Sequence, residues 1–274
     1  MNENFIINEN SIKEEFTILS TYLDSDLEHQ YCCNPGNSEL DRYSDIKCYN
    51  HNIIRINNGK GYINASPINI ITEKYFISTQ APKKETIEDF WTMIIENKSR
   101  IIIMLCKQIE NNREKCALYW EGETSKFNIK STEIKKEEQY IISEIEIINK
   151  KLNKKEKVTQ IKYIGWPDHG IPEASEKNFE SFCKIMWLAD EYKRNFPITI
   201  HCSAGVGRTG TFIAMYYLKK EIEKQINNNT EIIQFNIFNL VRKLKEMRMF
   251  LVQVVDQYIF IYLFVDYLLK KINI

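Results

Sequence analysis

The sequence predicts one α/β domain in which buried strands alternate with helices. Three observations indicate this class. The 274 residues can bury a large core, and they fit one domain better than two. Hydrophobic residues make up 43% and charged residues 27% of the chain, as in ordinary globular proteins. Apolar runs typical of buried parallel strands, at residues 100–106 and 197–201, are separated by segments with helical periodicity.

The N-terminal part begins with a predicted helix at residues 11–29. Ile12 and Leu19 follow helical spacing there, and Ser11 is a candidate N-cap. An Asn-Pro-Gly break follows this segment. Residues 1–35 are therefore predicted to form a helical extension that packs on the domain.

Strands and helices then alternate along the chain. Apolar and β-branched runs predict strands at residues 53–56, 61–68, 75–79 and 100–106. Helical periodicity predicts helices at residues 86–98, 175–192, 208–224 and 237–248. Residues 126–164 alternate through three predicted strands whose charged side chains block edge pairing. The apolar run at 258–269 is too short to span a bilayer and contains Asp266, so a buried helix is predicted.

A predicted strand, a glycine-containing loop and a predicted helix follow one another at residues 197–210, Pro-Ile-Thr-Ile-His-Cys-Ser-Ala-Gly-Val-Gly-Arg-Thr-Gly. Gly205 and Gly207 allow positive φ angles, so successive N–H groups can point into one concavity. The start of the following helix adds its own N–H groups and dipole. Such a cradle would bind a phosphate and favour the thiolate form of Cys202. Arg208 could grip two phosphate oxygens with its planar fork.

The alternative for Cys202 is a buried structural cysteine at the end of a core strand. A lone cysteine more often has that structural role. Here the cysteine is followed at a fixed distance by Arg208 and by the hydroxyl of Thr209, with two glycines between. This combination favours a nucleophile.

Residues 201–210 resemble the signature loop of the tyrosine-specific, cysteine-dependent protein tyrosine phosphatases, in their non-receptor-like catalytic domain. The resemblance implies a strongly twisted mixed β-sheet flanked by α-helices, with residues 1–274 forming a single catalytic domain. It places the active site at the carboxyl end of the strand before Cys202. It also implies that the phosphate oxygens are held by Arg208 and by the backbone of Ser203, Ala204, Gly205, Val206 and Gly207.

The second chemical motif is Gly-Trp-Pro-Asp-His-Gly at residues 165–170. Taken alone, it would more often be a turn with the aspartate as a cap. Beside the signature loop it resembles the family's mobile acid loop. Asp168 would then protonate the tyrosyl oxygen as the P–O bond breaks, and Trp166 would be the apolar anchor of the loop. His169 is assigned only to the rim of the pocket.

The third motif is Arg-Tyr-Ser-Asp at residues 42–45, which resembles the family's phosphotyrosine-recognition loop. The resemblance implies that Tyr43 stacks on the substrate ring and that Asp45 holds backbone N–H groups of the substrate. Ile46 would add an apolar wall. The family usually has Lys-Asn before Arg-Tyr, whereas this chain has Leu-Asp.

Further roles follow from the resemblance. Glu110 would form an ion pair with the signature arginine, although an ordinary solvated loop carboxylate is the alternative. Gln253 would position the hydrolytic water, with Gln257 as the second amide, although such glutamines are usually surface residues. Thr209 would hydrogen-bond to the sulfur of the nucleophile, and His201 would fix the orientation of the cysteine.

The sequence therefore predicts a hydrolase that removes phosphate from phosphotyrosine in proteins through a phosphocysteine intermediate. No metal or cofactor is needed, because an arginine and backbone dipoles stabilise the charge. Three alternatives remain: a dual-specificity phosphatase with a shallower pocket, an inactive phosphotyrosine-binding module, and an interaction scaffold with a vestigial pocket. The segment around Tyr43 argues against the first, and the presence of the nucleophile, acid and arginine argues against the other two.

Composition sets expectations about location and partners. Lys plus Arg and Asp plus Glu both total 37, so no global field would attract nucleic acid or an anionic membrane. The seven cysteines are odd in number and lack metal-ligand spacing, which favours a reducing compartment. The first ten residues contain acidic side chains and do not look like a secretory signal. A cytoplasmic monomer acting on phosphotyrosine-containing signalling proteins is expected.

Overall fold

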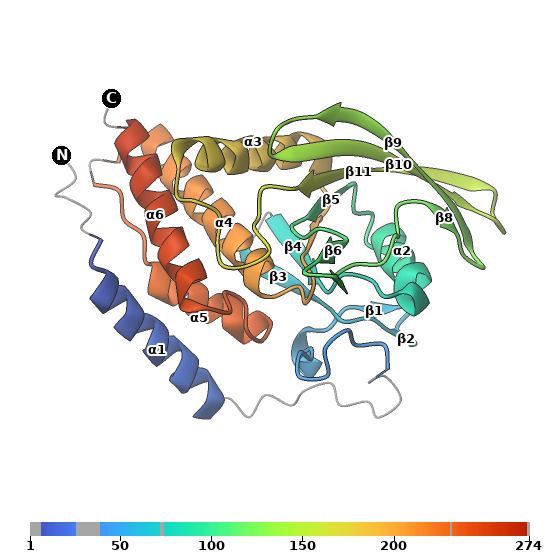
Figure 1. Ribbon diagram of the computed structural model, residues 1–274, viewed down its shortest axis with the longest axis horizontal. Helices are drawn as coiled ribbons and strands as arrows, with labels where there is room; N and C mark the ends of the chain where they lie inside the picture. The colour runs from blue at the N-terminus through green and yellow to red at the C-terminus, as the bar shows by residue number, and fades with distance from the viewer. Residues whose placement is uncertain (1–6, 26–38, 72–73, 231, 273–274) are drawn as a thin grey trace.

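The main feature of the computed structural model, which describes residues 7–25, 39–71, 74–230 and 232–272, is one twisted eight-stranded sheet (Figure 1). In spatial order its strands are β3 (Ala65–Ile71), β4 (Lys74–Thr79), β12 (Ile198–His201), β5 (Ile101–Met104), β11 (Lys154–Tyr163), β10 (Tyr140–Asn149), β9 (Phe127–Lys136) and β8 (Gly122–Glu123). Strands β4, β12, β5 and β11 run parallel, and the strands outside them pair antiparallel. The predicted mixed sheet is therefore confirmed.

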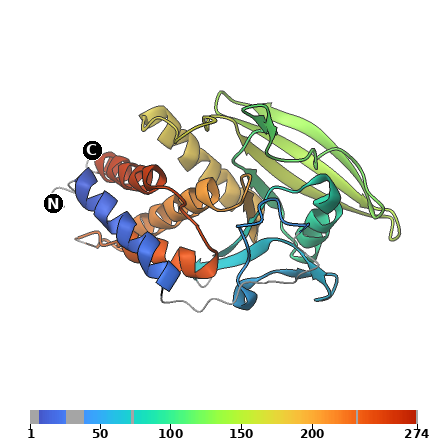
Figure 2. The same cartoon turned by 60° about the horizontal axis from the view of Figure 1, so that its bottom comes forward.

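Helices flank this sheet. Within the described residues they are α1 (Glu9–Ser25), α2 (Ile87–Glu96), α3 (Glu176–Lys193), α4 (Gly207–Asn227), α5 (Ile237–Met247) and α6 (Val255–Ile272), with short 3-10 turns at Asn50–Asn52 and Lys84–Thr86. Figure 1 and Figure 2 place α3 to α6 together on one side of the central strands and α2 on the other. In the part of the chain that the structure describes, no helix has both the length and the hydrophobicity needed to cross a membrane.

Two small two-stranded sheets were not predicted as such. One pairs β1 (Arg55–Ile56) with β2 (Gly61–Tyr62), and the other pairs β6 (Ile109–Glu110) with β7 (Arg113–Glu114). The second is a tight hairpin whose turn is Asn-Asn, with φ angles of 50° and 59°. Asparagine tolerates this left-handed region better than most residues, so the Asn-Asn pair in the sequence could have predicted the hairpin turn.

The central strands are buried on both faces. Every residue of β5 and β12 is buried, which explains why their sequences are nearly continuous apolar runs. The polar Thr199 is satisfied internally, since its hydroxyl donates to Ser99 Oγ at 2.9 Å. α4 packs on β12 and β4, and α3 packs on β5. The carboxyl end of β12 is therefore held rigidly, and Cys202 follows it directly.

The N-terminal helix packs on the domain as expected, with one correction. α1 contacts α5 and α6, and both Ile12 and Leu19 are buried. The N-cap is Asn8 rather than Ser11, because the Asn8 side chain accepts from the backbone N–H groups of residues 10 and 11. The predicted end of the helix at residues 26–29 lies outside the described residues.

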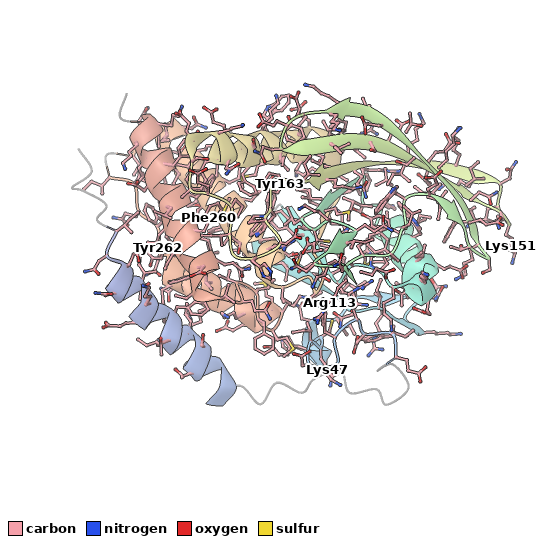
Figure 3. All side chains as sticks on the ribbon, in the orientation of Figure 1. Lys47, Arg113, Lys151, Tyr163, Phe260 and Tyr262 are labelled. Carbon is pink, nitrogen blue, oxygen red and sulfur yellow. The ribbon has the colours of Figure 1, made fainter. Side chains whose placement is uncertain are left out.

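A polar contact joins α1 to α6. Glu15 accepts hydrogen bonds from the hydroxyls of Tyr258, at 2.9 Å, and of Tyr262, at 2.6 Å. Figure 3 labels Tyr262 on the side of α6 that faces α1. We predict that Glu15→Ala lowers the free energy of unfolding by about 2 kcal/mol, because two charge-assisted hydrogen bonds are lost. Urea denaturation would measure this, with the exposed neighbour Glu14→Ala as the control. Equal stability of the two variants would contradict the prediction.

Candidate active site

The loop between β12 and α4 depends on one glycine. Gly205 has a φ of 70°, a left-handed conformation that side chains disfavour. A Cβ at this position would also lie 2.1 Å from the backbone oxygen of Thr79. Glycine is therefore required here for both conformation and space, as the sequence predicted. The positive φ angle expected at Gly207 is wrong, because Gly207 is already the first residue of α4.

The carbonyl groups of this loop face away from its concave side. The oxygen of Ser203 accepts from the backbone N–H of Ala81 at 2.9 Å, and the oxygen of Gly205 accepts from the hydroxyl of Ser78 at 2.9 Å. In a trans peptide the N–H group points opposite to the C=O group. Holding these oxygens at the back of the loop therefore turns the N–H groups of the following residues toward the front.

Most of the residues predicted for the site meet at one cavity of about 300 Å³. Twelve of them line it: Tyr43, Asp45, Ile46, Glu110, Asp168, Cys202, Ser203, Ala204, Gly207, Arg208, Gln253 and Gln257. Five do not line it but adjoin or contact residues that do: His201, Gly205, Val206, Thr209 and Trp166. A second cavity of about 360 Å³, between α3 and α6, contains none of them.

His201 is buried and orients the nucleophile segment through its backbone. One ring nitrogen, Nδ1, lies 3.0 Å from the carbonyl oxygen of Cys202, and the other, Nε2, lies 2.8 Å from the hydroxyl of Tyr119. That hydroxyl accepts from Gln160 at 2.7 Å, and because Met104 Sδ is 4.0 Å away, its proton is better placed to bond to Nε2. This arrangement leaves the proton on Nδ1, where it can bond to the carbonyl of Cys202.

The predicted contact of Thr209 is different. Its hydroxyl is buried and has no hydrogen-bond partner among the described residues. The hydrogen bond predicted from Thr209 to the sulfur of Cys202 is therefore absent from this structure. The role of Thr209 at the leaving sulfur stays a prediction.

Arg208 and Glu110 form the expected ion pair. The two guanidinium nitrogens Nη1 and Nη2 donate to the two carboxylate oxygens at 2.6 and 2.9 Å. Glu110 is only 3% exposed, so the alternative of a solvated loop carboxylate is wrong. Burial alone would lower the pKa of Arg208, but the hydrogen bond and charge of Glu110 raise it. The arginine is thus held as a cation with its fork fixed beside Cys202.

Asp168 projects into the same cavity and is held by two groups that sequence reasoning missed. Its carboxylate accepts from Lys107 Nζ at 2.9 Å and from the backbone N–H of Asn111 at 3.3 Å. These interactions, the Lys107 hydrogen bond first, lower the pKa of Asp168. Asn111 also bonds to the ring of His169 at 3.2 Å, which keeps that histidine at the rim.

Trp166 anchors the acid loop as predicted. It is almost fully buried, and its indole N–H donates to the carbonyl of Gly170 at 3.1 Å. The Arg208 guanidinium lies 5.7 Å from the centre of the indole ring and donates to the carbonyl of Pro167 at 3.3 Å. The acid loop is therefore fastened directly to the arginine of the cradle.

The recognition loop and the glutamine segment both line the cavity. The Tyr43 hydroxyl lies 2.9 Å from Ser203 Oγ, which fixes the ring at the edge of the cradle. Ile46 is buried beside it, whereas Asp45 is exposed at the mouth. In the glutamine segment, the side-chain oxygen of Gln257 accepts from the backbone N–H of Gln253 at 2.9 Å.

Comparison with known proteins gives a family. The family model for protein-tyrosine phosphatase matches residues 37–267. The chain belongs to the protein-tyrosine phosphatase family. This confirms the family and the fold class that the sequence predicted, and the matched range includes the loop after β12.

The chain is also similar to individual tyrosine phosphatases, both in sequence and in solved structure. The chain is 34% identical over 247 residues to human tyrosine-protein phosphatase non-receptor type 20, which covers 87% of this chain and 56% of the relative. It is 36% identical over 243 residues to human receptor-type tyrosine-protein phosphatase C, covering 83% and 18% respectively. The crystal structure of the catalytic domain of human protein tyrosine phosphatase non-receptor type 18 is 26% identical, with a TM-score of 0.84, and covers 94% of this chain and 96% of that chain. The chain spans little more than half of the non-receptor relative and a smaller share of the receptor-type one.

Lys115, Lys107 and Arg248 also belong to this site. Residues 115–120 resemble the family's Lys-Cys-x-x-Tyr-Trp segment, but no motif singled out Lys107 or Arg248. Lys115 lines the cavity, Lys107 holds Asp168, and Arg248 donates to loop carbonyls from behind. Isolated basic residues have no local pattern. Only the last, which follows α5, is fully buried, and burial is not visible in sequence.

The contact between Lys107 and Asp168 gives a direct titration test. We predict that Lys107→Met raises the pKa of the Asp168 carboxyl toward its ordinary value, because the hydrogen bond that stabilises the carboxylate is lost. Carbon-detected NMR titration of the side chain would measure the change. Lys150→Met, which breaks a distant ion pair with Glu123, is the matched control. A pKa of Asp168 that stays the same in both variants would refute the assignment.

Proposed function

We propose that this chain is a protein tyrosine phosphatase that hydrolyses phosphotyrosine in proteins, with residues 1–274 acting as one catalytic unit. One observation carries the proposal. Cys202 lies at a cradle of backbone N–H groups, beside an Arg208 fork held by Glu110, and Asp168 faces the same cavity. A nucleophile, an anion grip and a proton donor are the three parts that phosphate monoester hydrolysis requires.

In the first step the Cys202 thiolate attacks the phosphorus in line with the tyrosyl oxygen. The S–P bond forms, the P–O bond breaks, and Asp168 gives its proton to the leaving oxygen. The three remaining oxygens are held by the loop N–H groups and by Arg208, which stabilise the charge that develops on them. The product of this step is free tyrosine on the substrate and a phosphocysteine.

In the second step a water molecule attacks the phosphocysteine. Gln253 positions this water, and the Asp168 carboxylate formed in the first step accepts its proton. The S–P bond breaks, which releases inorganic phosphate and regenerates the Cys202 thiolate. Asp168 thus acts first as an acid and then as a base, and it regains the proton that the next catalytic cycle needs.

Asp168 must be protonated before the first step, although its low pKa favours the carboxylate. Its ion pair with Lys107 favours the carboxylate when the site contains no anion. A phosphate dianion in the cradle would favour the protonated acid, because like charges nearby raise a carboxyl pKa. Substrate binding therefore helps to load the proton that the reaction uses.

Selectivity for phosphotyrosine is supported by the position of Tyr43. Its hydroxyl is tied to Ser203 on the signature loop, so the ring stands at the pocket wall with Ile46 beside it. A side chain must reach past this wall to place its phosphate on Cys202. A phosphotyrosine is long enough, and its ring can stack on Tyr43, whereas phosphoserine gains no such contact.

We further propose that the protein works as a cytoplasmic monomer on phosphotyrosine-containing signalling proteins, without binding nucleic acid. Support comes from the free state of the described cysteines, Cys48, Cys106, Cys116, Cys183 and Cys202, which suits a reducing compartment. The equal numbers of acidic and basic residues give no general attraction for nucleic acid.

The proposal is tested with a phosphotyrosine peptide and two variants. We expect no turnover from Cys202→Ser, because the nucleophile is lost. Asp168→Ala should bind the peptide normally but turn it over about 10²- to 10⁴-fold more slowly, the usual contribution of general acid catalysis. Cys183→Ser, at a half-buried cysteine on α3, is the matched control and should behave like the wild type. Full activity of Cys202→Ser would refute the mechanism.

Adding a phosphoserine peptide to this experiment separates the alternative functions. Comparable rates on phosphoserine and phosphotyrosine peptides would indicate a dual-specificity phosphatase. Tight peptide binding by the wild type without any release of phosphate would indicate a binding module or a scaffold. We expect neither result, because the nucleophile, the arginine and the acid all meet at one cavity.

A further inference from the structure

A fully buried arginine supports the signature loop from behind. Arg248 follows the last turn of α5 and is 0% exposed. Its guanidinium donates to neutral acceptors in the described residues: Gly205 O at 3.0 Å, Ala204 O at 3.1 Å, Asn64 Oδ1 at 2.6 Å, Cys48 Sγ at 3.1 Å and Ser66 Oγ at 3.4 Å. A buried cation without a directly bonded carboxylate is unusual, because burial of an unpaired charge is costly.

Arg248 acts on the cradle through two peptide groups. It holds the carbonyl oxygens of Ala204 and Gly205 on the outer side of the loop. Because C=O and N–H point in opposite directions across a trans peptide, the N–H groups of Gly205 and Val206 are turned inward. The arginine therefore fixes two of the donors that the proposed reaction uses, and it adds positive charge close to the phosphate site.

The negative charge that balances Arg248 lies one residue further away. Asn64 links the two, since its oxygen accepts from Arg248 and its NH₂ group donates to Asp41 Oδ1 at 2.8 Å. The same Asp41 oxygen accepts from the hydroxyl of Tyr62 at 2.5 Å. Asp41 is 9% exposed, and Asn64 and Tyr62 are also buried. The chain Asp41–Asn64–Arg248 therefore runs through the interior from the recognition loop to the cradle.

We propose that Asp41 is a positioning residue that sets how strongly the cradle holds a phosphate dianion, acting through Asn64 and Arg248. The inference rests on the proposed phosphatase function and deepens it. Charges in a buried network are only weakly screened, so the carboxylate reduces the positive field of Arg248 at the cradle. The same carboxylate makes burial of the guanidinium tolerable. The charge of Asp41 thus lowers the affinity of the cradle for the anion and raises the stability of the fold.

The geometry allows this charge to be removed alone. Both hydrogen bonds to Asp41 go to the single oxygen Oδ1, so an asparagine carbonyl can accept both of them. Asp41→Asn therefore keeps the shape and the contacts of the network while it deletes the charge. If Asp41 were only a structural anchor, Asp41→Asn would either leave phosphate affinity and stability unchanged or lower both.

The test measures binding of inorganic phosphate by calorimetry, at a pH where phosphate is a dianion, together with thermal unfolding. For Asp41→Asn we expect the dissociation constant to fall about threefold, as for removal of one partly screened charge, and the melting temperature to fall as well. Glu114→Gln is the matched control, because this exposed carboxylate pairs with Arg42, the residue that follows Asp41. Its neutralisation should change neither quantity, since surface charges are screened by solvent.

A second variant keeps the test decisive if Asp41→Asn folds poorly. Arg248→Lys keeps the charge but loses the fork that holds both carbonyls, so the phosphate dissociation constant should rise about tenfold while the pH of optimal turnover stays the same. Unchanged phosphate affinity in this variant, or unchanged or weaker affinity in a folded Asp41→Asn, overturns the inference.

Failure of the inference and failure of the proposed function are distinguishable. If the wild type hydrolyses a phosphotyrosine peptide and binds phosphate, but Asp41→Asn binds phosphate like the wild type, only the role of Asp41 is wrong. If the wild type neither binds phosphate nor hydrolyses the peptide, the proposed function fails and the inference fails with it.

Discussion

The proposed reaction brings a thiolate and a phosphate dianion to one point although like charges repel each other. The sulfur of Cys202 and an incoming phosphate can share a site only if positive ends of dipoles face them from several sides. The loop after β12 provides this by turning its carbonyl groups outward, where Ser78, Ala81 and Arg248 bind them. The preorganised amides then need no rearrangement when charge develops, which is the condition for electrostatic catalysis.

The rest of the fold serves to keep that loop from relaxing. β12 is buried between two parallel neighbours, and α4 begins directly after the loop, so both ends of the loop are fixed. A Cβ at Gly210 would lie 2.4 Å from the backbone nitrogen of Val252, so α4 and the segment before α6 approach as closely as backbones can. This packing brings the glutamine segment to the cradle. The fold therefore also places Gln253, the residue proposed to position the hydrolytic water, at the cavity.

Sequence reasoning predicted the parts of this molecule that depend on local pattern or on contiguous motifs. Periodicity gave the helices and the buried strands, and the three loops around Tyr43, Asp168 and Cys202 were found as motifs. It could not find groups that reach the site from far along the chain. Lys107 bonds to an aspartate 61 residues away, and Arg248 bonds to a glycine 43 residues away. The Leu-Asp departure before the recognition loop was visible, but the partner of its carboxylate was not.

The hairpin of β6 and β7 links two parts of the chemistry. Glu110 on this hairpin bonds to Arg208, the residue proposed to bind phosphate, and Asn111, the next residue, bonds to Asp168, the proposed proton donor. The turn contains only two residues, both in the left-handed region, so it cannot accommodate a change of length without altering the pairing of β6 with β7. Insertion or deletion of a single residue in this turn would therefore disturb anion capture and leaving-group protonation at once. In related chains of different sequence, we expect its length to vary far less than its composition.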